Sequence, residues 1–237
     1  MNMRINKYLS ASGVLSRREA DRYILAGRIT IDGRTATMGE RVSGNEEIAV
    51  DGETVKSPEA VEKVVLAYYK EKGVVCSTVN QGREKNCIID RLSYPVRVYP
   101  IGRLDKDTEG LILLTNDGEL VNKLLKGVYG HEKEYEVTLN ENISDDVLLA
   151  MERGALPLLP DRKSRPCSIK RIDEKRFLCV LTEGMNRQIH RMAEYFGHSV
   201  AALKRLRFGG ITLDGLSPGG YRVLDEAEIS GLKRKIR

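Results

Sequence analysis

The apolar positions at the front of the chain first follow a helical period and then change to short β-like runs. Apolar residues within 5–9 recur at helical spacing before Gly13, a typical stop residue. Residues 20–24 repeat that spacing up to Gly27. Within 29–50, short apolar runs are each followed by an Asp-Gly pair, a typical tight-turn sequence. This pattern predicts two helices packed on a small sheet.

The second of these helices begins with a recognisable cap. Ser16 to Glu19 has the Ser-x-x-Glu form of a capping box. This places Arg17 and Arg18 in the first turn, where free backbone N–H groups and the positive end of the helix dipole favour an anion. Because arginines there repel the dipole, a phosphate is the partner that would compensate.

From Lys63 onward, strand-like runs alternate with helical segments. We expect strands at 64–69, 96–100, 111–115, 134–139, 167–172 and 177–181, and helices after Gly118, Ser144 and Asn186. The pattern predicts an α+β domain around a mixed, largely antiparallel sheet. With a linker at Ser57-Pro58, we expect one domain at 1–60 and a second at 63–237.

One acid stands at a turn between two predicted strands. Asp105 follows the strand-like run 96–100 and precedes the apolar run 111–114. An Asp in a turn usually serves only the turn. Asp105 is therefore a candidate catalytic residue only if other motifs accompany it.

Charge is unevenly distributed along the chain. The 39 Lys and Arg exceed the 34 Asp and Glu by five. Basic residues dominate 1–34, acids dominate 35–60, and further basic clusters occur within 187–207 and at 233–237. Separate basic patches suit a polyanion better than a small acid, although solvated faces of an ordinary protein are the alternative.

Several classes of protein are disfavoured. No run of about eighteen apolar residues occurs, and no apolar stretch follows the first charges, so we expect a cytoplasmic protein without a membrane span. The 4 Cys form no C-x-x-C pair and the 3 His are scattered, so we expect no metal and reduced thiols. The Gly-rich motifs of nucleotide cofactors are absent, so we expect no cofactor.

The front of the chain resembles the alpha-L RNA-binding domain. The similarity covers Met3 to Glu53 and rests on Arg-Ile-Asn-Lys-Tyr-Leu, Ser-Arg-Arg-Glu-Ala-Asp and Gly-Arg-Ile-Thr-Ile-Asp-Gly. The resemblance implies that the helices present basic side chains to structured RNA, here Arg4, Lys7, Arg17, Arg18 and Arg28.

The rest of the chain resembles the RsuA-type pseudouridine synthases of ribosomal RNA. The motifs are Gly102-Arg103-Leu104-Asp105 with the run to Gly118, then Lys133-Glu134-Tyr135, then Glu183 to Ile189. Asn186-Arg187-Gln188-Ile189 and Glu194 to Gly197 are closest to the RluF branch. The resemblance implies isomerisation of uridine to pseudouridine in large-subunit (23S) ribosomal RNA without a cofactor. Small-subunit ribosomal RNA and transfer RNA remain alternative substrates, and we expect a monomer.

The same resemblance assigns roles to individual residues. Asp105 matches the catalytic aspartate, and Tyr135 matches the tyrosine that stacks on the target base. Without the motif, a Tyr in a strand is more often simple packing. Arg103 would fill the space of the flipped base or hold a neighbouring phosphate. Asn186 and Gln188 would contact RNA.

Two positions depart from the family pattern. His190 stands where the family usually places the arginine that pairs with the catalytic acid, so His190, Arg187 and Arg191 are all candidates for that charge. We favour an arginine, because its bidentate fork holds a carboxylate more firmly than imidazole does. Glu71 stands where proline is common, and we expect only a local effect on the loop.

Two other functions fit part of this pattern. A ribosome-assembly or RNA-binding protein could keep both modules without turnover, although Asp105 and Tyr135 argue against it. A base-excising glycosidase would use a similar pocket but would leave an abasic product.

Overall fold

The computed structural model describes residues 2–77, 86–125 and 130–234, so positions 235–237 of the predicted basic tail lie outside the described residues. The chain forms two compact units. The first runs through Val64 and includes Tyr94–Val98 and Asn116–Gly118, and the second comprises the remainder. The expected domain limits, 1–60 and 63–237, remain a prediction about independent folding.

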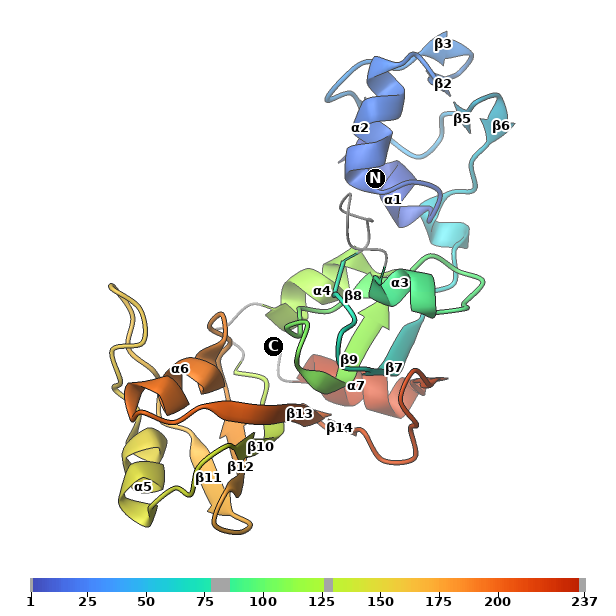
Figure 1. Ribbon diagram of the computed structural model, residues 1–237. Helices are drawn as coiled ribbons and strands as arrows, with labels where there is room; N and C mark the ends of the chain where they lie inside the picture. Colours follow the sequence, from blue (N-terminus) through green and yellow to red (C-terminus); the bar gives the residue numbers. More distant parts are fainter. Residues whose placement is uncertain (1, 78–85, 126–129, 235–237) are drawn as a thin grey trace. The chain divides into compact units, whose positions relative to one another are not determined.

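The first unit contains two helices and a small sheet, as expected (Figure 1). Its elements are β1 (Met3–Arg4), α1 (Ile5–Ala11), α2 (Arg17–Leu25), β2 (Ile29–Ile31), β3 (Arg34–Thr35), β4 (Arg41–Val42), β5 (Ile48–Val50), β6 (Glu53–Thr54) and the 3-10 helix Pro58–Ala60. The sheet order is β3-β2-β5-β6, and β1 pairs with β4. Apolar residues from both helices and from β2 and β5 form one core.

The predicted cap of α2 is confirmed. The backbone N–H of Glu19 donates to Ser16 Oγ at 3.2 Å, and the backbone N–H of Ser16 donates to the Glu19 carboxylate at 2.8 Å. These bonds, with the Arg97 charge, lower the pKa of Glu19 to about 2. Both predicted Asp-Gly turns occur, with φ of 48° at Asp32 and 52° at Asp51.

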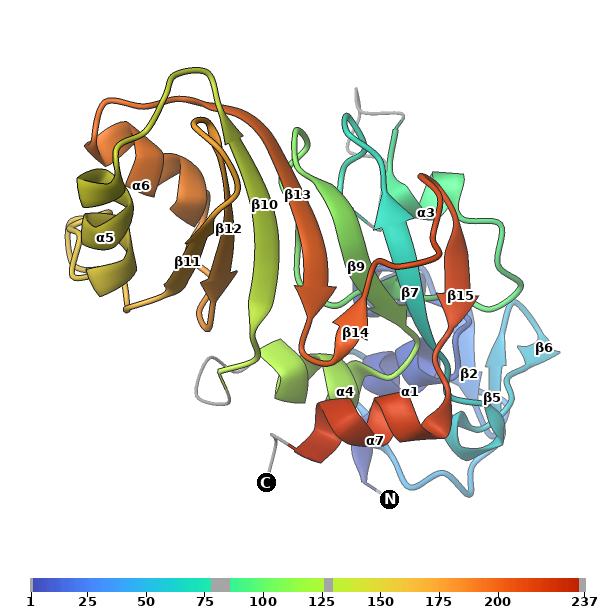
Figure 2. The same cartoon turned by 90° about the horizontal axis from the view of Figure 1, so that it is seen from below.

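The second unit is built on one continuous sheet, ordered β11-β12-β10-β13-β9-β7-β15 (Figure 2). The path strands are β7 (Val65–Lys70), β9 (Glu109–Thr115), β10 (Lys133–Leu139), β11 (Ser168–Arg171), β12 (Arg176–Leu181), β13 (Val200–Phe208) and β15 (Tyr221–Val223). Two short strands, β8 (Tyr99–Pro100) and β14 (Ile211–Thr212), pair with β9 and β13. Only β9 and β13 pair in parallel among the described strands, so the predicted mixed, largely antiparallel sheet is confirmed.

Helices cover each half of this sheet and enclose separate cores. In Figure 2, α5 (Asp145–Arg153) and α6 (Gln188–Tyr195) lie beside the β11–β12–β10 half. They share a core with β10 and β12. A second core joins α4 (Gly118–Leu125) and α7 (Glu226–Arg234) to β7, β9 and β14. A short helix, α3 (Ile88–Arg91), completes the unit.

The two halves meet at a narrow seam. The parallel pairing of β9 with β13 covers only Glu109 with Lys204 and Gly110 with Arg205. A Cβ at Gly110 would lie 2.3 Å from the carbonyl oxygen of Arg205, and the φ of Gly110 is +105°. Only glycine therefore allows the strands to approach this closely.

One expectation about strands was wrong, and one central strand was not predicted. The strand predicted at 96–100 is reduced to Tyr99–Pro100, because only these residues lie beside β9. The basic residues near position 205 belong to the long central strand β13, which the sequence did not predict. The other predicted strands and the helices after Gly118, Ser144 and Asn186 are present.

Within the described ranges, no helix has the length and apolar character needed to cross a bilayer. In the same ranges, no group of three or more metal-ligating side chains gathers. The four cysteines carry thiols and not disulfides.

Candidate active site

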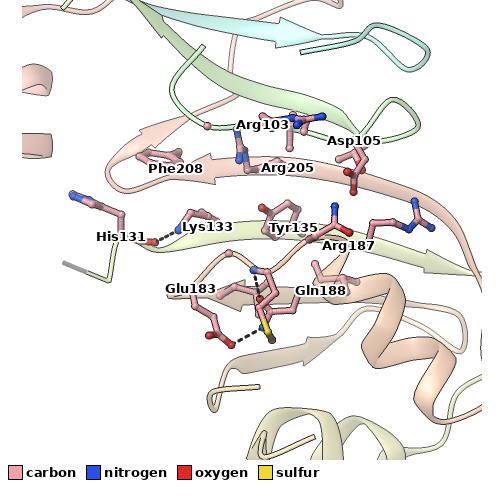
Figure 3. Close-up of a pocket in the computed structure, with 18 of the residues that line it drawn as sticks. Arg103, Asp105, His131, Lys133, Tyr135, Glu183, Arg187, Gln188, Arg205 and Phe208 are labelled. Atoms are coloured by element: carbon pink, nitrogen blue, oxygen red, sulfur yellow. Dashed lines mark hydrogen bonds between the residues drawn. The ribbon is translucent and has the colours of Figure 1, made fainter. Parts of the chain in front are cut away.

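A cavity of about 610 Å³ opens over the seam of the second unit, within the usual size range of ligand pockets. Its walls come from the loop before β9, from β10 and β13, and from the segment that leads into α6 (Figure 3). The motifs singled out in the sequence therefore converge on one cavity, although they are distant along the chain.

Asp105 lies on the loop that enters β9. Its carbonyl oxygen accepts a hydrogen bond from the N–H of Thr108 at 3.1 Å, which closes a turn. Figure 3 shows its carboxylate on the cavity side, facing Tyr135 and Arg187. The side chain is half-buried, so it is held by the protein and still reachable from the cavity.

A buried lysine, Lys70, holds the loop that carries Asp105 in place. Lys70 is fully buried, and its Nζ donates to the carbonyl oxygens of Glu71 at 2.9 Å and Lys106 at 3.3 Å. Burial lowers the pKa of Lys70, while the charges of Cys76, Glu71 and Asp105 oppose that shift. No motif in the sequence pointed to a role for Lys70. Glu71 does shape the local loop, because its carboxylate accepts a hydrogen bond from the Tyr68 hydroxyl at 2.9 Å.

Tyr135 projects from β10 into the middle of the cavity (Figure 3). It pairs across the sheet with Arg205 on β13 and with Cys179 on β12. Its ring is half-buried and lines the open space opposite Asp105, the position that a stacked base would need.

A buried carboxylate organises the segment before α6. Glu183 is 4% exposed and accepts from Gln188 Nε2 at 2.9 Å, from the Arg165 N–H at 2.8 Å and from Arg162 Nη2 at 3.0 Å. Gln188 also accepts from the Met185 N–H at 3.1 Å. Gln188 lines the cavity, and its amide also bonds within the protein, so its role in contacting RNA stays a prediction. Asn186 is exposed at the rim.

The three candidate charge partners of Asp105 lie in different places. Arg187 and His190 line the cavity, and Arg187 has a φ of 52°, a strained conformation for a non-glycine residue. Burial lowers the pKa of His190, the Arg187 charge lowers it further, and Asp105 opposes both. Arg191 is outside the lining, because its guanidinium donates to the carbonyl oxygens of Asn186 and Leu158. In the described part of the chain, Asp105 makes no ion pair.

Arg103 and Lys133 are among the other cations that line the cavity. Arg103 is exposed and forms no ion pair among residues 2–77, 86–125 and 130–234, so its guanidinium is available at the mouth. Lys133 donates to the carbonyl oxygen of His131 at 2.8 Å. Burial and the Arg205 charge lower the pKa of Lys133 to about 8. In the sequence, Lys133 stood out only as part of the Lys133-Glu134-Tyr135 motif.

The basic residues predicted to bind RNA in the first unit differ in their surroundings. Arg17 and Arg18 are exposed in the first turn of α2, and Arg4 and Lys7 are exposed at α1. Arg28 is already engaged, because its Nε donates to Asp51 at 2.6 Å and its guanidinium lies 3.8 Å above the Tyr23 ring.

Comparison with known proteins identifies this architecture. Residues 64–195 match the RNA pseudouridylate synthase family, and residues 3–48 match the S4 domain. The chain therefore belongs to the RNA pseudouridylate synthase family and is an RNA pseudouridine synthase with an amino-terminal S4 domain.

Individual relatives extend the match over nearly the whole chain. The dual-specificity RNA pseudouridine synthase RluF of Escherichia coli O157:H7 is 42% identical over 99% of this chain and 80% of its own length. The ribosomal large subunit pseudouridine synthase B of Bacillus subtilis is 36% identical over 97% of this chain and 95% of its own. A solved pseudouridylate synthase superposes with a TM-score of 0.70 at 28% identity, covering 97% of this chain and 99% of that one.

Proposed function

We propose that this enzyme isomerises a specific uridine of large-subunit ribosomal RNA, with Asp105 as the catalytic carboxylate. The observation that carries the proposal is that Asp105 and Tyr135 face one another across a single cavity on the sheet of a pseudouridine synthase. The names of the relatives in E. coli and B. subtilis support an RNA substrate of this kind.

The reaction breaks the bond between uracil N1 and ribose C1′, turns the base, and joins C5 to C1′. The hydrogen from C5 is lost and N1 regains one, so atoms and electrons balance without an oxidant. Asp105 acts at the sugar carbon or at its neighbouring proton while uracil leaves as an anion. Tyr135 stacks on the ring and keeps it in place. Water must be excluded, because it would intercept the sugar and release the base.

A stacked uridine has to be extracted from the RNA, at a cost of a few kcal/mol. Arg103, exposed at the mouth, occupies the vacated space or holds an adjacent phosphate. Of the candidate charge partners of Asp105, we propose Arg187, which lines the same cavity and carries a permanent charge. Arg4, Lys7, Arg17 and Arg18 bind RNA outside the cavity, and the enzyme acts as a cytoplasmic monomer.

The test maps pseudouridine in cellular RNA with and without this protein, and then in purified RNA treated with the wild-type protein or Asp105→Asn. Carbodiimide labelling should reveal one or more wild-type sites that Asp105→Asn does not form. Asp107→Asn is the matched control, because Asp107 is exposed two residues away and does not line the cavity.

Mass analysis separates the competing functions. Isomerisation leaves the mass of the RNA unchanged, whereas excision lowers it by one base and would contradict the proposal. Binding without any pseudouridine would contradict it equally. The dual-specificity name of the E. coli relative is the reason to assay transfer RNA and small-subunit ribosomal RNA in parallel.

A further inference from the structure

The register of β10 against β13 slips by one residue at the cavity. Glu134 pairs with Arg207, but the next residue, Tyr135, pairs with Arg205, so Leu206 is left without a partner on β10. Side chains alternate between the two faces of a strand, and an extra residue in one strand re-aims those beyond it. The slip therefore places Arg205 and Phe208, three positions apart, on the same face of the sheet as Tyr135.

Arg205 is almost completely buried on that face, with 3% of its surface exposed. Its Nε donates to the carbonyl oxygen of Leu111 on β9 at 2.6 Å, which ties the guanidinium across the seam. Among the described residues, its Nη2 has no hydrogen-bond partner although it is shielded from water. Buried guanidinium groups normally satisfy their donors, so this one lacks an acceptor.

A second cation stands beside it. Lys133 Nζ and the Arg205 guanidinium each lie 5.6 Å from the centroid of the Phe208 ring, and both line the cavity that holds Tyr135 (Figure 3). The acids in the lining are Asp105 and Glu183, and Glu183 is already paired with Arg162. Lys133 and Arg205 thus face the cavity without an ion pair to either acid of its lining.

We propose that Arg205, assisted by Lys133, donates to a carbonyl oxygen of the target uracil and stabilises the negative charge that the ring acquires when its bond to ribose breaks. This assignment rests on the proposed isomerisation. Both groups are fixed before the substrate arrives, Arg205 by Leu111 and Lys133 by the His131 carbonyl, as electrostatic stabilisation of a developing charge requires.

Burial decides between the base and the phosphate backbone as the acceptor. A flipped base enters a pocket while its phosphates stay near the mouth, where the exposed Arg103 and Arg187 lie. Arg205 is more deeply buried than these two arginines. It lies on the same face of the sheet as Tyr135 and is the residue paired with Tyr135 on the neighbouring strand. An uncharged uracil oxygen that becomes anionic during the reaction therefore suits Arg205 better than a phosphate does.

The experiment compares single-turnover rates of cleavage of the bond between the base and ribose on one RNA that carries either uridine or 5-fluorouridine at the target position. The readout is the loss of the target nucleoside, measured by digestion and mass analysis, because 5-fluorouridine has no C5 hydrogen to lose and cannot complete the isomerisation. Fluorine withdraws electrons, so the departing ring needs less stabilisation. We expect Arg205→Met to lower the rate on uridine RNA on the order of 10²-fold. The loss on 5-fluorouridine RNA should be clearly smaller, and RNA dissociation constants should not change. Arg205→Lys should recover part of the rate.

Two further variants separate this role from a structural one. Lys133→Met should also lose more rate on uridine RNA than on 5-fluorouridine RNA, and it leaves the bond from Arg205 to Leu111 intact. If Arg205→Met fails to fold, Lys133→Met still tests the proposal. Arg207→Met is the matched control, because Arg207 lies two residues along β13 and is paired with Glu132 and Glu134. Arg207→Met should keep the wild-type ratio between the rates on uridine RNA and on 5-fluorouridine RNA.

Equal losses on both RNAs for Arg205 and Lys133 variants would overturn the proposal. Weaker RNA binding with an unchanged rate at saturation would also overturn it, since a phosphate contact behaves in that way. A wild-type protein that forms no pseudouridine in any RNA would remove the proposed function itself, and with it this role.

Discussion

The Nζ of Lys70 donates a hydrogen bond at 3.3 Å to the carbonyl oxygen of Lys106, the residue that follows Asp105. The last residue of β7 thus fixes the position of the loop that carries the carboxylate. The Lys70 side chain is fully buried, and its bond joins two segments that the sequence separates by 36 positions.

Replacing Lys70 by Met should leave the carbonyl oxygens of Glu71 and Lys106 without their donor. A hydrogen bond from a charged donor contributes about 1.5–3 kcal/mol, so the free energy of unfolding should fall by up to that amount. Pseudouridine formation should slow, because the Asp105 loop loses its support. Urea unfolding and a turnover assay measure both, and Lys72→Met, at an exposed site, should change neither.

Replacing Glu183 by Ala should release the segment before α6. The Arg165 N–H and the Gln188 amide would lose their acceptor inside the protein, which predicts a loss of about 1–3 kcal/mol in unfolding free energy. Glu174→Ala is a suitable comparison, because among the described residues its carboxylate accepts only from the exposed Asn142. Such surface changes stay within about 0.5 kcal/mol. Identical urea midpoints for the two variants would contradict this role of Glu183.

Replacing Gly110 by Ala should force β9 and β13 apart. The new Cβ would lie 2.3 Å from the Arg205 carbonyl oxygen, and its backbone would be strained as well. Together these effects predict a loss of roughly 2–5 kcal/mol. Gly197→Ala separates the backbone strain from the steric clash. Gly197 has a φ of +79°, so the added carbon strains the backbone, but no atom lies within 4 Å of it. If both variants lose the same stability in thermal unfolding, the close approach at the seam is unimportant.

Replacing Arg17 and Arg18 together by Ala should weaken RNA binding without unfolding the first unit. Each lost phosphate contact lowers the slope of log affinity against log salt by about 0.7–0.9. Titrations of RNA at several salt concentrations give that slope. Arg34→Ala should leave it unchanged, because Arg34 is paired with Glu40. A double variant with the wild-type slope would show that the first turn of α2 does not touch phosphate.

The pH dependence of stability should reveal Lys133. Its pKa is about 8 in the folded protein against 10.5 for an ordinary lysine, so between these values the unfolded chain holds more of this proton. Stability should therefore rise as pH increases from about 8 towards 10.5, and below 8 the full penalty of burying the charge is present. Turnover should fall over the same range as the cation is lost.

Urea midpoints measured from pH 7 to 10 test this, with Lys133→Met as the reference. The variant should lack the part of the alkaline rise that Lys133 contributes. Parallel curves for wild type and variant would mean that Lys133 titrates like a lysine in water.

The sequence predicted the elements whose signals are local. Apolar periodicity, the Ser16 cap and the Asp-Gly turns depend on neighbouring residues, and they correctly predicted both helices of the first unit and most strands of the second. The motif around Asp105 predicted a turn before a buried strand, and that arrangement is present.

The missed features depend on pairing between distant segments. β13 contains three basic residues in four positions, 204–207, which as a sequence indicate a charged surface. They become strand because β9 and β10 supply hydrogen bonds on both sides. The role of Arg205 arises from a register slip and that of Lys70 from contact across 36 positions, and neither leaves a local pattern.

The position of β13 between β9 and β10 also sets an order of events during synthesis. The strand that joins the two halves of the sheet is made of residues 200–208, and the acid and the tyrosine are translated long before it. A growing polypeptide on its ribosome therefore carries both groups on unconnected pieces of sheet, and it gains a working pocket only after residues 200–208 have been added.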